Sequence, residues 1–155
     1  MDSKGRFSIP ANLRADLRIQ SPDQKTLHIS MHDRYDCAIA FGESGFIDLK
    51  DQIVREEEKA TRLGQDYDAA DTYQRRFGIM DTTTFDDGGR FSLPAHFRAL
   101  CGITDCVFFI GAGPNIEIWS PERFLEAEGP NERLKFVCRM ALEEWRSNPK
   151  NKAGK

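Results

Sequence analysis

The segment DSKGRFSIPANLRA at residues 2–15 returns as DDGGRFSLPAHFRA at residues 86–99. With an offset of 84 positions (86 − 2), residues 2–19 and 86–103 align without a gap. The identical pairs are Asp2/Asp86, Gly5/Gly89, Arg6/Arg90, Phe7/Phe91, Ser8/Ser92, Pro10/Pro94, Ala11/Ala95, Arg14/Arg98, Ala15/Ala99 and Ile19/Ile103. Chance does not produce this agreement, so the chain is internally duplicated, and each copy is expected to form one supersecondary unit.

Within each copy, the residue types predict a turn, a strand and a short helix. Residues 86–89, Asp-Asp-Gly-Gly, are typical of a tight turn, because glycine accepts a positive φ without steric cost. Residues 90–93 then alternate as in a strand. Pro94 suits the first helical position, and the helix predicted over residues 95–100 is closed by Gly102. The same signals predict a helix over residues 10–17.

Each motif is followed by two apolar runs that predict a hairpin leading into a helix. The predicted hairpin strands are 26–30 with 37–41 and 107–110 with 116–119. The other predicted elements are helices over 46–63, 67–77, 121–128 and 134–145, and a strand over 79–85. The apolar face of the last helix covers the core or packs on a neighbouring subunit. We therefore divide the chain into a first unit (1–78), a second unit (79–130), and a C-terminal helix with a disordered tail (131–155).

The composition is typical of a globular protein and argues against a membrane protein, a disulfide-rich protein and a metalloprotein. The chain has 155 residues, 39% of them hydrophobic, which fits one domain or two half-size units. No apolar run is long enough to span a membrane, and no signal peptide is present, so a cytoplasmic protein is expected. The four cysteines suggest no disulfide framework and are expected to be reduced. His96, Cys101 and Cys106 are too loosely spaced to favour a metal site, and no cofactor is expected.

Charge is distributed unevenly along the chain. Residues 1–20 carry four basic and two acidic side chains, a net charge of +2, whereas residues 21–85 carry eight basic and thirteen acidic ones, a net charge of −5. Residues 86–104 balance two arginines against two aspartates. Because the whole chain has a net charge of −3, any site for a polyanion must be local, and the second motif is expected to be the weaker one.

Each motif places an aspartate and an arginine four residues apart around a glycine, and this pair has two interpretations. As an exposed salt bridge, it would contribute only about 0–1 kcal/mol. As a presented binding group, its planar guanidinium would donate paired hydrogen bonds to phosphate oxygens or to a guanine edge. With so few cations per turn, several copies on one assembled particle would be needed for affinity.

The paired DxxxR motifs, Asp2 to Arg6 and Asp86 to Arg90, resemble the MraZ family. FIGAGPNIEIWSPERF at residues 109–124 is similar to the second hairpin and following helix of that family. The resemblance implies an α+β fold with two tandem swapped-hairpin units of the AbrB/SpoVT type, flanking helices and pseudo-twofold duplication. It also implies a ring-shaped homo-oligomer, cytoplasmic and nucleoid-associated, that binds repeats in double-stranded promoter DNA. Such a regulator would mostly repress its own division and cell-wall gene cluster.

The same resemblance assigns roles to individual residues. Arg6 and Arg90 would contact DNA, Asp2 and Asp86 would orient the arginines or the turn, and Lys4 would add a phosphate contact. Arg14 and Arg98 would contact phosphate or serve the helix and the subunit interface. The residues expected in the DNA-binding site are Asp2, Lys4, Arg6, Arg14, Asp86, Arg90 and Arg98.

The sequence departs from the family at its front edge. The family has a strand before its first DxxxR motif, whereas this sequence starts Met1-Asp2. We expect the first unit to borrow a pairing strand from a neighbour or to leave an exposed edge.

Two other classes of function stay open. A protein-binding module of the antitoxin type would use the acidic interval 56–71 and tolerate loss of the arginines. An enzyme using Asp2 and Arg6, or a cysteine, has less support, because the sequence contains no GxSxG, HExxH or P-loop motif.

Overall fold

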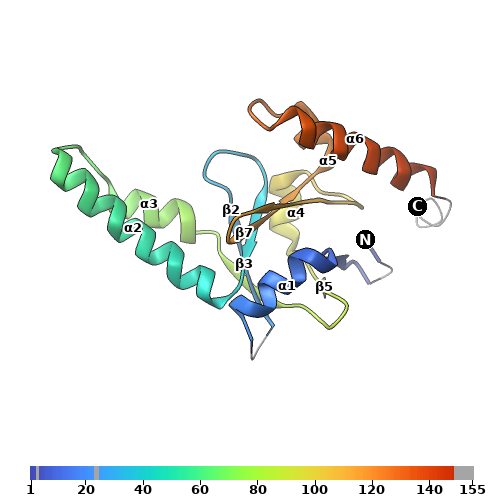
Figure 1. The fold of residues 1–155 in the computed structure, drawn as a ribbon, viewed down its shortest axis with the longest axis horizontal. Coiled ribbons are helices and arrows are strands. Elements are labelled where there is room, and N and C mark those ends of the chain that lie inside the picture. The colour runs from blue at the N-terminus through green and yellow to red at the C-terminus, as the bar shows by residue number, and fades with distance from the viewer. Residues whose placement is uncertain (3, 23–24, 149–155) are drawn as a thin grey trace.

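The computed structural model describes residues 1–2, 4–22 and 25–148, which form the expected α+β fold (Figure 1). A strand, a helix, two strands and a helix follow one another twice along the chain. The elements are β1 (Phe7–Ser8), α1 (Ala11–Gln20), β2 (Thr26–Met31), β3 (Ala38–Phe41), α2 (Glu43–Leu63), α3 (Ala69–Phe77), β4 (Asp81–Thr84), β5 (Arg90–Phe91), α4 (Ala95–Cys101), β6 (Phe108–Ala112), β7 (Asn115–Trp119), α5 (Pro121–Glu126) and α6 (Glu132–Ser147).

Local sequence signals locate these elements well and misplace a few ends. The strand predicted over 90–93 is only Arg90–Phe91, because the chain turns towards α4 at the following residues. Pro10 and Pro94 are the N-caps of α1 and α4, one residue before the expected position. Gly102 closes α4 in the left-handed conformation (φ 64°), as predicted. Of the tail predicted to be disordered, residues 149–155 lie outside the described part.

The larger sheet mixes strands from the two halves of the chain. Its order is β4-β2-β3-β7-β6, and all its pairs are antiparallel. At its centre, β3 pairs with β7, with Ile39 opposite Glu117. β4, which leads into the second motif, pairs with β2 of the first half. β6 is the other edge strand, next to which Met1 donates its terminal amino group to the Asp105 carbonyl oxygen (2.6 Å).

The two copies of the motif pair directly with each other. β1 and β5 form a two-stranded antiparallel sheet in which Phe7 lies opposite Phe91 and Ser8 lies opposite Arg90. The rings of Phe7 and Phe91 lie 6.4 Å apart, and both side chains are buried. This pairing brings the turns that precede β1 and β5 onto the same part of the molecule.

One apolar core lies beneath both turns. The repeated apolar positions are all buried: Phe7 and Phe91, and then Ile9 and Leu93. Leu17 of α1 and Phe97 of α4 close the same cluster. Full burial of a side chain of this size stabilises the folded state by about 1.5–3 kcal/mol. The apolar half of each motif thus anchors the turn that carries the charged half.

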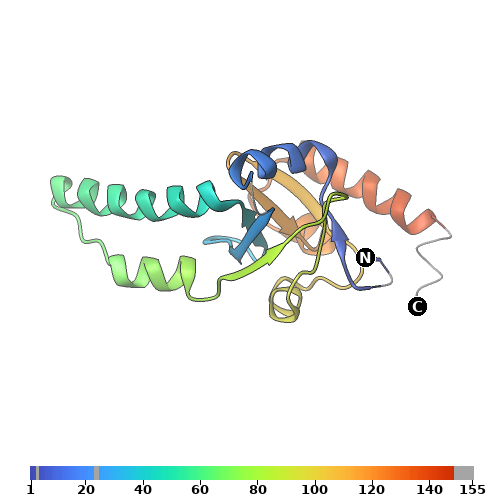
Figure 2. The same cartoon turned by 90° about the horizontal axis from the view of Figure 1, so that it is seen from below.

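The α2–α3 pair and α6 lie on opposite sides of this body (Figure 1). α2 and α3 form an antiparallel pair that projects to one side, and the acidic interval 56–71 lies at its far end (Figures 1 and 2). Arg76 anchors the pair, because it bonds to Asp33 (2.9 Å) and to Glu56 (3.2 Å). On the other side, α6 packs Cys138 and Leu142 inwards. Across the described residues, no helix combines the length and apolar character needed to cross a bilayer.

Candidate nucleic-acid interface

The two DxxxR motifs fold into turns with the same hydrogen bonds. In the first, Asp2 N–H donates to the Arg6 carbonyl oxygen (2.8 Å) and Gly5 N–H donates to that of Asp2 (3.0 Å). In the second, the matching bonds of Asp86 and Gly89 measure 3.0 and 2.8 Å. Gly5 and Gly89 have φ values of 74° and 76°, a left-handed conformation that side-chain-bearing residues rarely adopt. The glycine in each motif is therefore required by the turn.

Each aspartate ties its arginine to the turn. Asp86 accepts a hydrogen bond from the Arg90 backbone N–H (2.9 Å) through Oδ1 and another from Arg90 Nε (2.7 Å) through Oδ2. Asp2 accepts the equivalent bonds from Arg6 at 2.9 and 3.0 Å. A spacing of four residues is needed, because one carboxylate has to reach both the backbone and the side chain of the arginine. The aspartate fixes the direction in which the guanidinium points.

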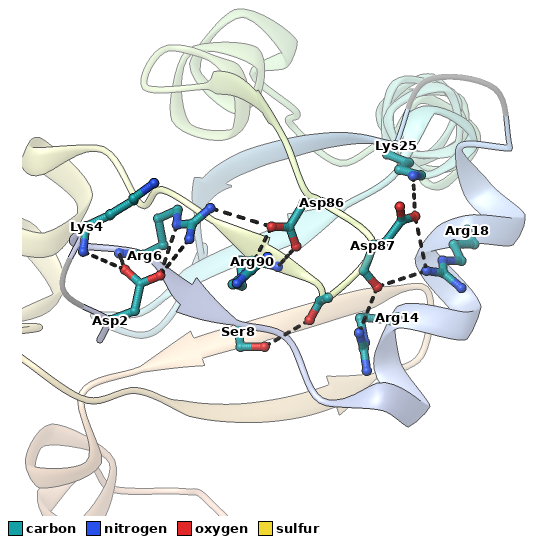
Figure 3. Close-up of polar contacts among 11 residues, drawn as sticks. Asp2, Lys4, Arg6, Ser8, Arg14, Arg18, Lys25, Asp86, Asp87 and Arg90 are labelled. Carbon is teal, nitrogen blue, oxygen red and sulfur yellow. Dashed lines mark hydrogen bonds and ion pairs between the residues drawn. The ribbon is translucent and has the colours of Figure 1, made fainter. Parts of the chain in front are cut away.

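The two arginines differ in how many of their nitrogens are already bound. Arg6 also places its Nη2 2.9 Å from Asp2 and its Nη1 3.5 Å from Asp86, which connects the two turns, and its side chain is 27% exposed. Arg90 is bound only through Nε to Asp86 among the described residues, and its side chain is 51% exposed. Arg90 therefore presents its two terminal nitrogens for a further ligand (Figure 3).

Residues of the first half surround the second turn. Arg14 Nη1 and Arg18 Nη2 donate to the Asp87 carbonyl oxygen at 3.0 and 3.1 Å. Lys25 Nζ bonds to Asp87 Oδ1 at 2.5 Å, and Arg18 lies 3.9 Å from the same oxygen (Figure 3). The charge count over residues 86–104 is therefore misleading: the second turn takes its cations from residues far away in the sequence.

Of the cations around the second turn that come from the first half of the chain, Arg14 was predicted from the sequence, and Arg18 and Lys25 were not. The position of Arg18 one helical turn after Arg14 on α1 was an available signal, because residues four apart share a helix face. Nothing in the sequence indicated Lys25, which approaches Asp87 from 62 residues away. Lys25 also has a φ of 48°, the only positive φ outside glycine among the described residues.

Two other expected site residues lie at the first turn. Lys4 donates its backbone N–H to Asp2 (2.9 Å), and no bond of its Nζ is found among the described residues. Arg98, on α4, approaches Met1 Sδ with Nη1 (3.9 Å), while its buried Nε has no hydrogen-bond partner within the described part of the chain. Arg14 and Arg98 thus each lie beside the turn of the opposite motif.

The result is a locally basic surface on an acidic protein. The labelled charged groups of Figure 3 comprise six cations and three carboxylates, a net charge of +3 (6 − 3), against −3 for the whole chain. They are Lys4, Arg6, Arg14, Arg18, Lys25 and Arg90, with Asp2, Asp86 and Asp87. Exposed guanidinium groups held at fixed positions suit the recognition of phosphate or of base edges.

The pairing lowers the pKa values of the turn carboxylates. The backbone N–H of Arg90, and then its side chain, hold the pKa of Asp86 below its usual value, and Arg6 does the same for Asp2. Because the pKa is lower in the folded than in the unfolded chain, the pairings stabilise the fold above the unfolded-state pKa of about 4. This stabilisation is lost as the pH falls through the lower, folded-state pKa.

Arg90→Ala should raise the pKa of Asp86 only part of the way back, because the backbone N–H of residue 90 still donates to the carboxylate. The measurement is an NMR pH titration of the Asp86 carboxyl carbon. Arg75→Ala, which removes an exposed arginine paired with Asp71, is the control and should leave Asp86 unchanged. An Asp86 pKa that is the same in Arg90→Ala and in the unmodified protein would contradict the geometry described above.

The cysteines and histidines offer no comparable cluster. All four cysteines are free thiols, and burial raises the pKa values of Cys101, Cys106 and Cys138 to about 11. Burial likewise raises the pKa of Cys37. These thiols are therefore protonated at neutral pH and are weak nucleophiles. Within residues 1–2, 4–22 and 25–148, no three His, Cys, Asp or Glu side chains converge as they would around a metal ion.

Comparison with known proteins gives relatives that all carry the same family name. Residues 77–133 match the family model of the MraZ protein, which is described as antitoxin-like. The Transcriptional regulator MraZ of Rickettsia bellii is 33% identical over 142 residues, covering 92% of this chain and 89% of the relative. Proteins of the same name are 33% identical in Rickettsia akari, over 80% of this chain and 78% of the relative, and 31% identical in Parvibaculum lavamentivorans, over 78% and 71%.

Proposed function

This chain belongs to the MraZ family, and on that premise we propose that it is a transcriptional regulator that binds double-stranded DNA through its two DxxxR turns. The observation that carries the proposal is the state of Arg90: Asp86 holds its guanidinium through one nitrogen, the other two make no bond among the described residues, and the side chain is 51% exposed. An arginine oriented in this way pairs bidentately with a guanine edge or a phosphate.

The surroundings of Arg90 favour a polyanion over a neutral partner. Arg6 lies next to it on the same surface, connected through Asp86, and the cations of α1 flank the second turn. Asp2 and Asp86 orient the two arginines, Lys4 and Arg14 contact phosphate, and Arg98 supports the first turn. The surface thus combines groups that position the duplex with groups that read its sequence.

We infer further that affinity comes from assembly. One chain presents two arginine turns and few unpaired cations, so it would release few counterions and bind weakly alone. In a ring-shaped homo-oligomer, several turns engage successive DNA repeats, and each further contact becomes intramolecular. The proposed target is the promoter of the protein's own division and cell-wall gene cluster, which it represses as a cytoplasmic, nucleoid-associated protein.

The proposal is tested by titrating the full chain onto duplex DNA that contains short tandem repeats from its own promoter and onto a scrambled duplex. Fluorescence anisotropy should give tighter binding to the repeats and a steep loss of affinity from 50 to 200 mM salt, about tenfold or more. Sedimentation in the same buffer should show an oligomer. A monomer, or binding that ignores both salt and repeats, would overturn the proposal.

A protein-binding module of the antitoxin type is the second candidate, and the projecting α2–α3 pair favours it. The far end of this pair carries the acidic interval 56–71 and lies away from the arginine turns (Figure 2). If purified protein does not bind repeat DNA but retains a protein partner after Arg90→Ala, and loses that partner when Glu57 and Glu58 are changed to glutamine, this second function is the correct one.

A further inference from the structure

Asp87 differs from the other two aspartates of the turns. Asp2 and Asp86 accept hydrogen bonds from backbone N–H groups and so build their turns. The Asp87 carboxylate is bonded to the side chain of Lys25 and lies near that of Arg18, and it remains 86% exposed. Its carbonyl oxygen, not its carboxylate, receives the bonds from Arg14 and Arg18 that hold the turn.

We propose that Arg18 and Lys25, beside the second turn, form a binding site for one DNA backbone phosphate, and that the Asp87 carboxylate occupies this site until DNA displaces it. The proposal rests on the proposed DNA-binding function. A phosphate offers anionic oxygens to the same donors, and charge-assisted bonds from lysine and arginine are the usual means of holding it.

Exposure makes the exchange physically reasonable. The side chains of Arg18 and Lys25 are 50% and 41% exposed, so both are open to an incoming phosphate once the Asp87 side chain turns away. Exposed ion pairs of this kind contribute little to stability, so little opposes their replacement. The Asp87 carboxyl has a lowered pKa, with Lys25 as the main cause, so it is anionic at neutral pH, as a phosphate substitute has to be.

The backbone conformation at Lys25 holds this lysine beside the second turn. Its left-handed conformation is unfavourable for a residue with a side chain, yet it allows the Lys25 carbonyl oxygen to accept a bond from Phe85 N–H (3.2 Å) while Nζ reaches Asp87. This hydrogen bond connects the segment around Lys25 to the start of the second turn. The cation and the turn are therefore held together.

Among the residues that the structure describes, the second turn has this pair of cations and the first does not. At the offset of 84, Arg18 corresponds to Gly102. At the second turn, the Lys25 carbonyl oxygen accepts a hydrogen bond from Phe85 N–H. At the first turn, the equivalent bond runs from the terminal amino group of Met1 to the Asp105 carbonyl oxygen. The first turn thus has a glycine and an aspartate where the second has two cations. The inferred site makes the two turns unequal: the second both presents the freer arginine and holds a phosphate beside it.

The test compares Asp87→Asn with Asp36→Asn in the anisotropy titration. Asparagine keeps the carbonyl that Arg14 and Arg18 use but removes the competing charge. We expect Asp87→Asn to bind repeat DNA about two- to fivefold more tightly than the unmodified protein. Asp36→Asn makes the same charge change at an 85% exposed aspartate paired only weakly, with Arg123 at 3.9 Å, and should change affinity less. Weaker binding by Asp87→Asn, or equal effects of the two variants, would overturn the proposal.

Arg18→Gln/Lys25→Gln supplies the second arm. It should bind more weakly and, because one phosphate contact is lost, lower the slope of log affinity against log salt by about one for each bound chain. Adding Asp87→Asn to it should then give no gain in affinity. Binding by Arg18→Gln/Lys25→Gln that equals the unmodified protein would contradict the site while leaving the proposed function intact.

A measurement without DNA distinguishes the proposed anion site from the proposed DNA-binding function. In Asp87→Asn, inorganic phosphate should shift the side-chain NMR signals of Lys25 and Arg18 at lower concentration than in the unmodified protein. If the unmodified protein does not bind repeat DNA but this shift is observed, the DNA-binding function fails and the anion site stands. If phosphate leaves both signals unchanged in Asp87→Asn, the site is refuted.

Discussion

Replacing both Arg6 and Arg90 with alanine is expected to lower the affinity for repeat DNA by about 100-fold or more. Each oriented guanidinium contributes about 1–3 kcal/mol when it pairs bidentately, and in an assembly the loss is repeated in every bound chain. Anisotropy titration at fixed salt measures the effect. Arg75→Ala/Arg146→Ala removes the same charge from two arginines that are 53% and 57% exposed, and it should bind nearly as the unmodified protein does.

The single variants should divide this loss unequally. Arg90→Ala removes the arginine with two accessible nitrogens, so it should weaken DNA binding more and leave the fold intact. Arg6→Ala removes bonds to both Asp2 and Asp86, so it should also lower the melting temperature by a few degrees. Equal affinity of Arg6→Ala/Arg90→Ala and Arg75→Ala/Arg146→Ala would show that the arginine turns do not contact DNA.

Gly89→Ala is expected to destabilise the protein by about 2–3 kcal/mol, against about 1 kcal/mol for Gly113→Ala. Both glycines have a left-handed φ, 76° and 69°, so both variants incur the backbone cost. A Cβ at residue 89 would overlap Cδ of Arg14 and lie 3.0 Å from the Ile9 carbonyl oxygen, whereas a Cβ at residue 113 would meet no atom of the described residues within 4 Å. Arg14 would then lose its bond to Asp87.

Urea unfolding measures this difference, and Arg14→Ala identifies its source. In the Arg14→Ala background, the cost of Gly89→Ala should fall towards that of Gly113→Ala, because the overlapping side-chain atoms are gone. Gly89→Ala should also weaken DNA binding, since it displaces the turn, and Gly113→Ala should not. Equal destabilisation by the two glycine variants would mean that the close approach of Arg14 is not required at the second turn.

Local structure was predictable because its signals are local. The turn of residues 86–89, the helix closed by Gly102 and the hairpin leading to Pro121 each depend on residues within a few positions. The pairing of β1 with β5 was not predictable, because two-residue strands carry no periodic pattern and their contact spans the whole linking segment. The apolar motif residues indicated burial but not which copy they would pack against.

The candidate site was half predictable for the same reason. Asp86 and Arg90 contact each other across four residues, so the motif itself revealed them. Arg18 reaches the second turn from 69 residues away and Lys25 from 62. A charge count along the chain assigns Arg18 to the first motif and Lys25 to the acidic segment 21–85. Only the folded arrangement shows that the second motif, neutral by sequence, has the denser group of cations.

The short ladder between β1 and β5 also fixes the spacing between the two arginine turns. Because Phe7 lies opposite Phe91 in a fixed register, the distance between the two arginines is set by hydrogen bonds and not by the length of the α2–α3 segment. That segment can lengthen, shorten or change sequence during evolution without altering the spacing that the turns measure. Shifting the register by one residue would instead turn the phenylalanines out of the core, so the spacing of the turns and the packing of the core can change only together.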